Sequence, residues 1–595
     1  MVLDSDPVAF SNWIVPALLS FLTSAATLCA VALVGGYLIS AFRYGPVGGG
    51  DVIYRMVLGG VRDLIALSPR RILALAWLAV QESLRRRVLV GFGIFLLILL
   101  FAGWFLDTQS NDPATLYLSF VLTATTYLVL LIALFLSAFS LPADIKNHTI
   151  YTIVTKPVRS GEIVLGRIVG FAVIGTVLLA VMGLFSYVFV IRVLNHTHEV
   201  DVASLRPVPN DPNGDRAGRT SLAQNHRHTL KIGPDGTGST DMVQGHFHEV
   251  TAQESGDKTT YVVGPPQGLL TARVPAYGDL RFKDRAGKAS DRGISVGKEW
   301  KYHSYVEGAT LAKAIWTFSD ITPERFPDGL PVEMTIRVFR SYKGDIEKGI
   351  RGSLVLKNPR TGRASDEKFF IAKDFYIDFL KIPRNLTDPT GKPLDLFDDL
   401  VSDGQVEVWM QCLDASQYLG VAKGDLYLRS RDASFTLNFI KSYLGIWVQM
   451  LLVTSLGVMF STFLSGPVAM MATLASLVLG FKAQFVLGVA KGAIEGGGPV
   501  ESFIRIVKQQ NVTTQLEPGL TTTVVKWADS VFMSFMTAIT GLLPNFNQFS
   551  NVSYVAHGFD IPPDAVLVQV FSAAGYVIAA LAIGYLFLRT REVAR

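Results

Sequence analysis

The sequence has few cysteines and few charged residues, and it lacks the short motifs of ATP hydrolysis and of zinc proteases. Only two cysteines occur in 595 residues. Cys29 lies in an apolar run and Cys412 in a strand-like run, so we expect no internal disulfide. The sequence contains no Gly-x-x-x-x-Gly-Lys-Ser/Thr phosphate loop and no His-Glu-x-x-His motif. We therefore expect a chain that is not an enzyme and does not hydrolyse ATP by itself.

Charge is scarce because much of the chain is apolar. Hydrophobic residues make up 50% of the sequence and charged residues 17%, a balance outside the usual range for soluble globular proteins. Runs of about 18 or more apolar residues predict membrane-spanning helices. Seven such runs cover residues 13–42, 88–106, 115–141, 168–192, 437–463, 466–488 and 564–588. The first is too long for a signal peptide and lacks a basic leader, so we expect it to be retained; cleavage is the alternative.

The distribution of arginine and lysine predicts the orientation of these helices. Basic residues collect in segments 43–87, 143–167 and 589–595, which places all three in the cytoplasm. The leader 1–12 has two aspartates and no basic residue, so the N-terminus is expected outside. Seven spans then leave residues 193–436 outside and the C-terminus inside. The sequence predicts a multi-pass protein of the cell membrane, in a bacterium the inner membrane, without a nucleic-acid partner.

Residues 70–87 predict an amphipathic helix before the second span. One helical face carries the apolar residues Leu73, Trp77, Val80 and Leu84, and arginines flank it. Such a helix is expected to lie flat on the inner leaflet. The alternative is a basic helix next to the membrane that contacts no other structure.

The loop 142–167, between the third and fourth spans, predicts a docking helix. Ile150, Ile153 and Val154 form a short apolar stripe at helical spacing, and Pro157 ends the helix. Four basic residues hold the loop in the cytoplasm: Lys146, Lys156, Arg159 and Arg167. The pattern favours a mechanical contact over a catalytic loop.

The residues of this loop resemble, in the same order, the coupling loop of type-2 ABC transporter permeases. In that family an acidic or polar residue precedes a short helix with threonine, followed by Lys-Pro, a basic residue and a Gly-Arg or Gly-Lys that opens the next membrane helix. The matching positions here are Asp144, Asn147, Thr149, Ile150, Thr152, Ile153, Val154, Lys156, Pro157, Arg159, Gly161, Glu162, Gly166 and Arg167. The resemblance implies that the short helix docks on a separate P-loop ATPase subunit, which would bind ATP and magnesium.

The resemblance covers about 70–192 and 437–595 and implies a six-helix permease core. It makes the helix carrying Leu73, Trp77, Val80 and Leu84 an elbow beside the ATPase, and it implies a homodimer or a pair with a related permease. The chain then divides into an extra N-terminal membrane helix (1–45), a cytoplasmic segment (46–87), two core halves (88–192 and 437–595) and an insertion (193–436). Residues 527–543 are expected to form a re-entrant or surface helix on the outer side, or else a buried loop helix.

The insertion is predicted to be mainly β. Apolar residues alternate with polar ones over 332–338 and again over 406–412, as in strands that have one buried face. These strands predict a β-sandwich over about 300–432. Residues 200–295 are rich in Gly, Asp, Pro, Thr and Ser and are expected to form a hairpin and flexible loops.

Six of the nine histidines form three His-x-His pairs. They are His196 with His198, His226 with His228, and His246 with His248. Alternate residues of a strand face the same side. Turn residues near 233–241 predict a hairpin over about 222–250, centred on Thr237, which places His226 opposite His248. It also places His228 opposite His246.

Four imidazoles on one face would suit zinc, copper or nickel. His196 and His198 could complete this site or be unrelated to it. The alternative is a solvated loop whose histidines become charged and repel one another below neutral pH.

Together these patterns predict the permease subunit of an ATP-binding cassette transporter, which moves a substrate or transmits force using a separate ATPase. The alternative is a membrane-anchored receptor without transport that binds a metal or a partner through residues 193–436. An anchor has no need of a docking helix that ends in Lys-Pro, so the loop distinguishes the two hypotheses.

Overall fold

The computed structural model describes residues 8–85, 88–106, 112–149, 158–209, 214–255, 258–296, 302–341, 348–373, 378–494, 496–511, 514 and 516–590. The described residues form two compact units. We call the first the β unit; it comprises Thr271–Leu437 with Gly558–Asp560. We call the second the helical unit; it takes in the described residues before Thr271, together with Asn438–His557 and those from Ile561 onward.

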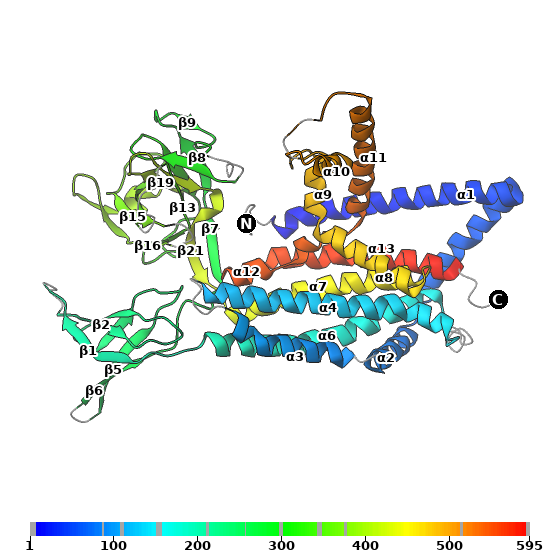
Figure 1. Cartoon of the computed structure of the whole chain (residues 1–595), viewed down its shortest axis with the longest axis horizontal. Coiled ribbons are helices and arrows are strands. Elements are labelled where there is room, and N and C mark those ends of the chain that lie inside the picture. The colour runs from blue at the N-terminus through cyan, green and yellow to red at the C-terminus, as the bar shows by residue number, and fades with distance from the viewer. Residues whose placement is uncertain are drawn as a thin grey trace. The chain divides into compact units, whose positions relative to one another are not determined.

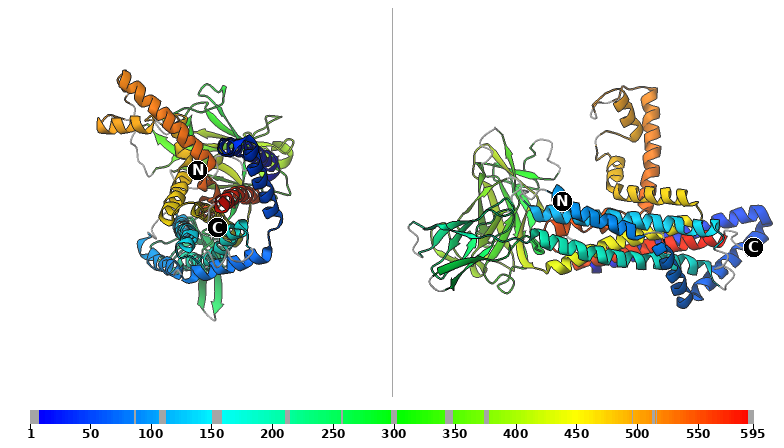
Figure 2. Two further views of the ribbon diagram at one scale, coloured as in Figure 1. Left: turned by 90° about the vertical axis from the view of Figure 1, so that its right-hand side faces the viewer. Right: turned by 60° about the horizontal axis from the view of Figure 1, so that its bottom comes forward.

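The helical unit is built largely from long helices (Figure 1). Their bounds are α1 Phe10–Ile65, α2 Pro69–Arg85, α3 Val88–Phe105, α4 Pro113–Lys146, α6 Ser160–Leu194, α7 Phe435–Ser461, α8 Gly466–Phe481, α9 Ala483–Ala490, α10 Pro499–Val507, α11 Leu520–Leu542, η3 Phe546–Phe549, α12 Val552–Ala556 and α13 Pro563–Thr590. Helices α4 and α13 both pack along α6 (Figure 2).

Several of these helices are long and apolar enough to cross a membrane. Among the described residues they are α1, α4, α6, α7 and α13, and the pair α8 and α9 adds a sixth if it counts as one bent span. The predicted second span coincides with α3, whose apolar part, Val90–Ala102, is shorter. Apolar helices of this length characterise a membrane protein. The number of spans and their orientation stay predictions.

Three predicted helices differ from the structure in their bounds or shape. The first continues to Ile65 and is kinked at Gly45, which has a φ of 75° and is followed by Pro46. Proline inside a helix removes a hydrogen bond and bends it. The predicted span 466–488 is two helices, α8 and α9, bent by 64°. The helix predicted at 527–543 begins earlier, at Leu520.

Helix α2 packs on α6 through small residues. A Cβ added to Gly166 would lie 2.6 Å from the Cβ of Leu75, and one added to Gly170 would lie 2.7 Å from the Cβ of Ala79. Glycines four residues apart on one helix face let two helices approach closely. The two backbones are therefore nearly in contact, and no side chain on this face of α6 separates them.

The side of α2 that packs on α6 is not the apolar face read from the sequence. Of that face Val80 is buried, whereas Leu73 and Trp77 are each 63% exposed and Leu84 is 50% exposed. The buried side is made largely of Ala76, Ala79, Val80 and Ser83, and the place of the apolar face on the inner leaflet stays a prediction. Close contact with the glycines selects small residues for the inner face, so the bulky apolar side chains point outward.

We expect Gly170→Ala to destabilise the helical unit. The new methyl group would lie 2.5 Å from the carbonyl oxygen of Ala76, and overpacking of this kind costs about 1–3 kcal/mol. Gly93→Ala is the matched control, because a Cβ at Gly93 in α3 meets no other atom within 4 Å and alanine is the better helix former. Thermal unfolding in detergent should show a lower midpoint for Gly170→Ala alone; equal midpoints would contradict the close packing.

The β unit contains fifteen described strands. They are β7 Arg273–Tyr277, β8 Asp279–Lys283, β9 Ala289–Ser290, β10 Ser304–Glu307, β11 Lys313–Phe318, β12 Leu330–Met334, β13 Arg337–Arg340, β14 Ile350–Lys357, β15 Lys368–Ala372, β16 Asp378–Ile382, β17 Asn385–Thr387, β18 Pro393–Asp395, β19 Val406–Cys412, β20 Gln417–Val421 and β21 Leu426–Asp432. Two short helical turns, η1 Leu396–Leu400 and η2 Lys423–Asp425, join them.

These strands form four antiparallel sheets around one apolar core. The two larger sheets have the orders β15-β14-β19-β11-β8-β9 and β16-β12-β21-β7, and both contribute side chains to that core. Smaller sheets follow the orders β10-β20-β13 and β17-β18. The strand predicted from alternating apolar residues over 406–412 is confirmed as β19. The strand predicted over 332–338 is instead divided between two strands, β12 and β13. The mainly-β unit begins near 271, before the predicted boundary at 300.

A separate six-stranded sheet belongs to the helical unit and follows α6. Its strands are β1 Val200–Pro207, β2 Arg216–Thr220, β3 Thr229–Ile232, β4 Thr237–Thr240, β5 Glu249–Ser255 and β6 Lys258–Val263, paired in sequence order. We call residues 196–264 the histidine sheet. A bridge between Glu199 and Val262 brings its first and last strands together. The prediction of one hairpin with flexible loops over 200–295 is therefore wrong.

The register predicted for the histidine hairpin is also wrong. Strands β3 and β4 pair Leu230 with Thr240 and Ile232 with Gly238, which centres the hairpin near Asp235 and not on Thr237. The turn is fixed by Gly236, whose φ is 77°, and by the Asp235 carboxylate, which accepts a hydrogen bond from the backbone N–H of Thr237 at 3.1 Å. The His-x-His pairs consequently lie outside this hairpin.

Candidate metal centre

The three His-x-His pairs occupy equivalent places in the histidine sheet. Each pair precedes an odd-numbered strand: it stands directly before β3 and β5, and one residue, Glu199, separates it from β1. Two pairs follow a tight turn of residues with positive φ, Gln224-Asn225 in one and Gln244-Gly245 in the other. Turns of this kind reverse the chain, so both pairs point back into the sheet.

Backbone hydrogen bonds repeat in the same way. Ser221 N–H donates to Glu199 O, Asp241 N–H to Thr229 O and Gly264 N–H to Glu249 O, at 2.7–2.8 Å. In every bond the acceptor is the residue that directly follows a histidine pair. In the first two bonds the donor lies five positions before the next pair. In the third bond Gly264 is the equivalent donor. The sheet is thus three copies of one unit, and each copy brings two histidines to the same centre.

A backbone carbonyl holds each imidazole through Nδ1. The first histidine of every pair reaches the carbonyl two residues earlier: His196 to Leu194 at 3.0 Å, His226 to Gln224 at 3.3 Å and His246 to Gln244 at 3.4 Å. The second reaches into the next copy: His198 to Ser221 at 2.9 Å, His228 to Asp241 at 2.9 Å and His248 to Gly264 at 2.8 Å.

These contacts fix the tautomer of all six rings. A carbonyl oxygen only accepts hydrogen bonds, so Nδ1 must carry the proton and Nε2 of the neutral ring carries a lone pair. Metal-binding histidines are held in this way, with the second nitrogen donating to a carbonyl or carboxylate. The six rings are therefore oriented as metal ligands.

The six Nε2 atoms converge on one point. The Nε2 of His246 lies 3.0 Å from that of His196, 3.2 Å from that of His226 and 3.3 Å from that of His228. The Nε2 of His248 is buried without a hydrogen-bond partner. Lone pairs this close repel one another unless a cation lies between them. The cluster could bind a metal ion.

Burial favours the neutral form of five of the six imidazoles: His196, His198, His226, His246 and His248. His228, His246 and His248 are fully buried, His198 and His226 nearly so, and His196 is half-buried. Desolvation, reinforced by the neighbouring imidazoles, lowers the pKa of His246 to about 2 and the pKa of His196 and of His248 to about 4. Burial also lowers the pKa of His198 and of His226. Neutral imidazole is the form that binds metals.

The structure brings together all six histidines that the sequence pointed to. His226, His228, His246 and His248 were expected to share a site, and His196 and His198 join them. Two overlapping sets of four have ligand nitrogens within 4.8 Å of one another: His196, His198, His246 and His248, and His198, His226, His228 and His246. Sequence reasoning placed four of them on one face of a hairpin and left open whether His196 and His198 belong to the site. The shared pattern Gln-Asn/Gly-His-x-His at 224–228 and 244–248, with Asn-His-x-His at 195–198, was the signal that could have revealed it.

The predicted coupling loop is described only at its two ends. Ile150, Thr152, Ile153, Val154, Lys156 and Pro157 lie outside the described residues. At the first end, the Thr149 hydroxyl donates to the Asp144 carboxylate at 3.0 Å, and Asn147 caps α4. At the second end, Arg159 caps α6, which contains Gly161, Glu162, Gly166 and Arg167.

Charged residues tie these two ends to α2. Arg167 in α6 is 4% exposed and forms ion pairs with Glu82 of α2 and with Asp144 near the end of α4. The fully buried Glu162 carboxylate accepts hydrogen bonds from Arg71 Nε at 2.8 Å and Nη2 at 2.7 Å. Three helices therefore meet in the ionic cluster of Arg167, Glu82 and Asp144, and the pair of Arg71 and Glu162 links α2 to α6 a second time.

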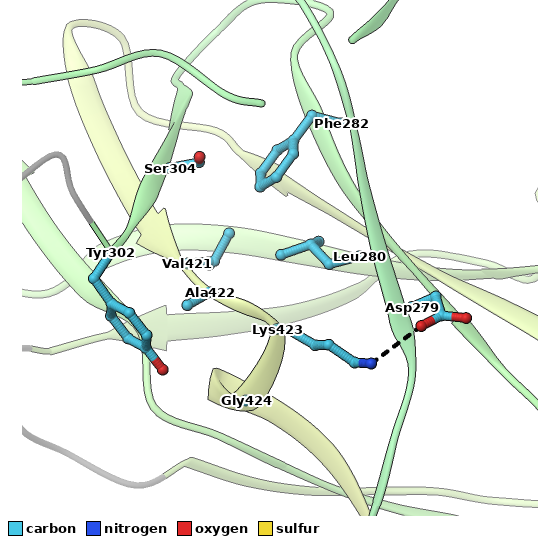
Figure 3. A pocket seen from close by; sticks show the side chains of 9 residues that line it. All are labelled: Asp279, Leu280, Phe282, Tyr302, Ser304, Val421, Ala422, Lys423 and Gly424. Carbon is cyan, nitrogen blue, oxygen red and sulfur yellow. Dashed lines mark hydrogen bonds and ion pairs between the residues drawn. The ribbon is translucent and has the colours of Figure 1, made fainter. Parts of the chain in front are cut away.

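The β unit has a pocket of about 380 Å³ (Figure 3). Asp279, Leu280, Phe282, Tyr302, Ser304, Val421, Ala422, Lys423 and Gly424 line it. Its charged groups are Lys423 and Asp279, which form an ion pair at 3.1 Å with side chains 39% and 86% exposed. An ion pair between exposed side chains is a weak interaction because water screens its charges. The buried histidine cluster is therefore the stronger candidate site.

No protein-family model matches the sequence, and no curated protein matches it. The fold and the site define a helical membrane protein that carries a separate mainly-β unit and a buried cluster of six histidines able to hold a metal ion.

Proposed function

We propose that this chain is the membrane-spanning subunit of an ATP-driven transporter and works with a separate P-loop ATPase subunit. It lies in the cell membrane with its N-terminus and residues 193–436 outside and its C-terminus in the cytoplasm. A second copy, or a related permease, completes the complex. Its task is to move a substrate or to transmit force to the outer part of the chain.

The ionic cluster at Arg167 is the observation that carries this proposal. The docking loop joins α4 to α6. Arg167 of α6, after the loop, forms an ion pair with Asp144 of α4, before the loop. It also binds Glu82 of α2. A pull on the loop is therefore passed to α2, α4 and α6 together, because a buried ion pair resists separation.

Further contacts link the start of α6 to other helices of the same unit. The Arg159 guanidinium binds Asp63 of α1 at 2.6 Å, and the Tyr585 hydroxyl of α13 donates to Asp63 at 2.8 Å. ATP-driven closure of the ATPase pair would move the loop, and these links would carry the motion to the long helices. In an anchor without a moving partner the same contacts would only hold the helices together.

Affinity purification of the tagged, detergent-solubilised protein from its native membrane tests the proposal. A stoichiometric P-loop ATPase should co-purify with the wild-type chain and be lost from Ile153→Asp, which puts a charge on the docking stripe. Val202→Asp is the matched control, because Val202 is 58% exposed in β1, far along the chain from the loop. Recovery of the chain alone under mild conditions would contradict the proposal.

The histidine cluster favours a second candidate function. In this reading the helices only anchor the chain, and the outer part binds zinc, copper or nickel, or a partner, without transport. Ile153→Asp would then change no association, while metal binding would persist. The same purification distinguishes the two functions.

A further inference from the structure

We propose that the six histidines form one octahedral site for a divalent first-row ion that favours six ligands, namely Ni²⁺, Co²⁺ or Fe²⁺. All six positions are filled by imidazole Nε2. This inference deepens the metal-binding function above and rests on it, and it holds whether or not the helices transport a substrate.

The pattern of ring contacts is that of an octahedron. Six ligands make fifteen pairs, of which an octahedron has twelve neighbours and three opposites. Twelve ring pairs have centroids 4.8–5.2 Å apart. The three pairs left over among these six described residues are His196 with His228, His198 with His246, and His226 with His248. Every histidine belongs to one of these three opposite pairs and neighbours the other four.

The sequence repeat explains this arrangement. The first histidines of the three pairs form one triangular face, with Nε2 separations of 3.2, 3.0 and 3.2 Å. The second histidines form the opposite face, with ring centroids 5.0–5.1 Å apart. Three copies of a two-ligand unit around one axis generate the two staggered triangles of an octahedron.

Five of the twelve neighbouring Nε2 separations fit the bond lengths of a six-coordinate ion. Neighbouring ligands of an octahedron lie √2 bond lengths apart, so these five separations of 3.0–3.3 Å correspond to metal–nitrogen bonds of about 2.1–2.3 Å. Tetrahedral zinc binds nitrogen at about 2.0–2.1 Å and takes four ligands. It would leave two of these buried lone pairs without a partner.

A site with six protein ligands is closed. Catalytic metals keep an open position for water or substrate, whereas structural metals do not. The ion here is therefore held and not used for hydrolysis, and it joins the three copies of the sheet. Imidazole ligands favour nickel and iron over magnesium and calcium, and the Nδ1–H bonds to carbonyls strengthen each ligand.

Spectroscopy of the full-length protein in detergent tests the geometry without any substitution. The protein is stripped with a chelator and reloaded with Co²⁺ or Ni²⁺ alone. We expect the weak visible absorption of six-coordinate Co²⁺, and X-ray absorption at the nickel edge should count six nitrogen neighbours. Intense tetrahedral Co²⁺ bands, or four nitrogens, would overturn the octahedral site.

Substitutions test whether the first pair belongs to the site. His196→Ala and His198→Ala should each weaken Ni²⁺ binding tenfold or more, as should His246→Ala. The matched control is His557→Ala, which removes an exposed histidine of the helical unit. Unchanged affinity in His196→Ala and His198→Ala, with loss in His246→Ala, would leave a four-histidine site and refute the octahedron. No Ni²⁺ or Co²⁺ binding by the wild-type protein would refute the metal-binding function itself.

Discussion

Ni²⁺ at one hundred times its dissociation constant should slow amide hydrogen exchange in the histidine sheet about a hundredfold, equivalent to about 2.7 kcal/mol of added stability. The gain is expected because the ion binds six ligands that come together only in the folded sheet. Mass spectrometry of peptides from 200–263, with and without a chelator, measures the effect. Peptides from 348–373 in the β unit contain no histidine and serve as the internal reference.

The small core of the histidine sheet is the reason for this large effect. Four buried residues form it: Leu230, Ile232, Val250 and Val263. Domains with so few apolar contacts usually need a metal or a disulfide for stability, and neither cysteine lies in this sheet. The chelated protein should therefore open locally at 200–263 first.

Histidine substitutions provide the control for this experiment. His246→Ala should exchange at the chelated rate even when Ni²⁺ is present, whereas His557→Ala should behave as wild type. Exchange in the wild-type sheet that does not respond to Ni²⁺ would show that the metal does not stabilise the fold.

Local sequence patterns predicted strands and helices well where the spacing of apolar residues alone determined which side chains are buried. Strand β19 has buried Val406, Val408 and Met410 at alternate positions, as its sequence indicates. The same rule failed at Glu333, which is buried beside Arg273 and Arg429. Its charge is matched by residues distant in sequence, which a local pattern cannot show.

The site was predictable in its residues but not in its geometry. The three His-x-His pairs pointed to metal chemistry, yet the hairpin register depended on the turn at Gly236. The place of His196 and His198 depended on the bridge between Glu199 and Val262. The elbow helix shows the same limit, because its inner face was selected by glycines of α6 that lie some ninety residues later.

Arg167→Met should destabilise the helical unit by about 3 kcal/mol. The substitution keeps much of the side-chain volume but leaves Asp144 and Glu82 without their buried partner, and breaking a buried ion pair costs about 3–5 kcal/mol. We expect the lower end because Glu82 keeps 23% of its side-chain exposure. Thermal unfolding of the detergent-solubilised protein measures the loss. Arg55→Met is the control, since its pair with Asp51 is exposed on both sides.

A triple variant separates charge from packing in this cluster. Adding Glu82→Gln and Asp144→Asn to Arg167→Met removes the two carboxylate charges that faced Arg167, so much of the lost stability should return. Stability that does not return would mean that Arg167 acts through its packing. The same variants also test coupling. The stabilised triple variant keeps its docking loop, so it should still bind the ATPase. If the cluster transmits the motion, this variant should fail to couple ATP hydrolysis to transport. Full coupling in that variant would show that the ionic cluster only holds α2, α4 and α6 together.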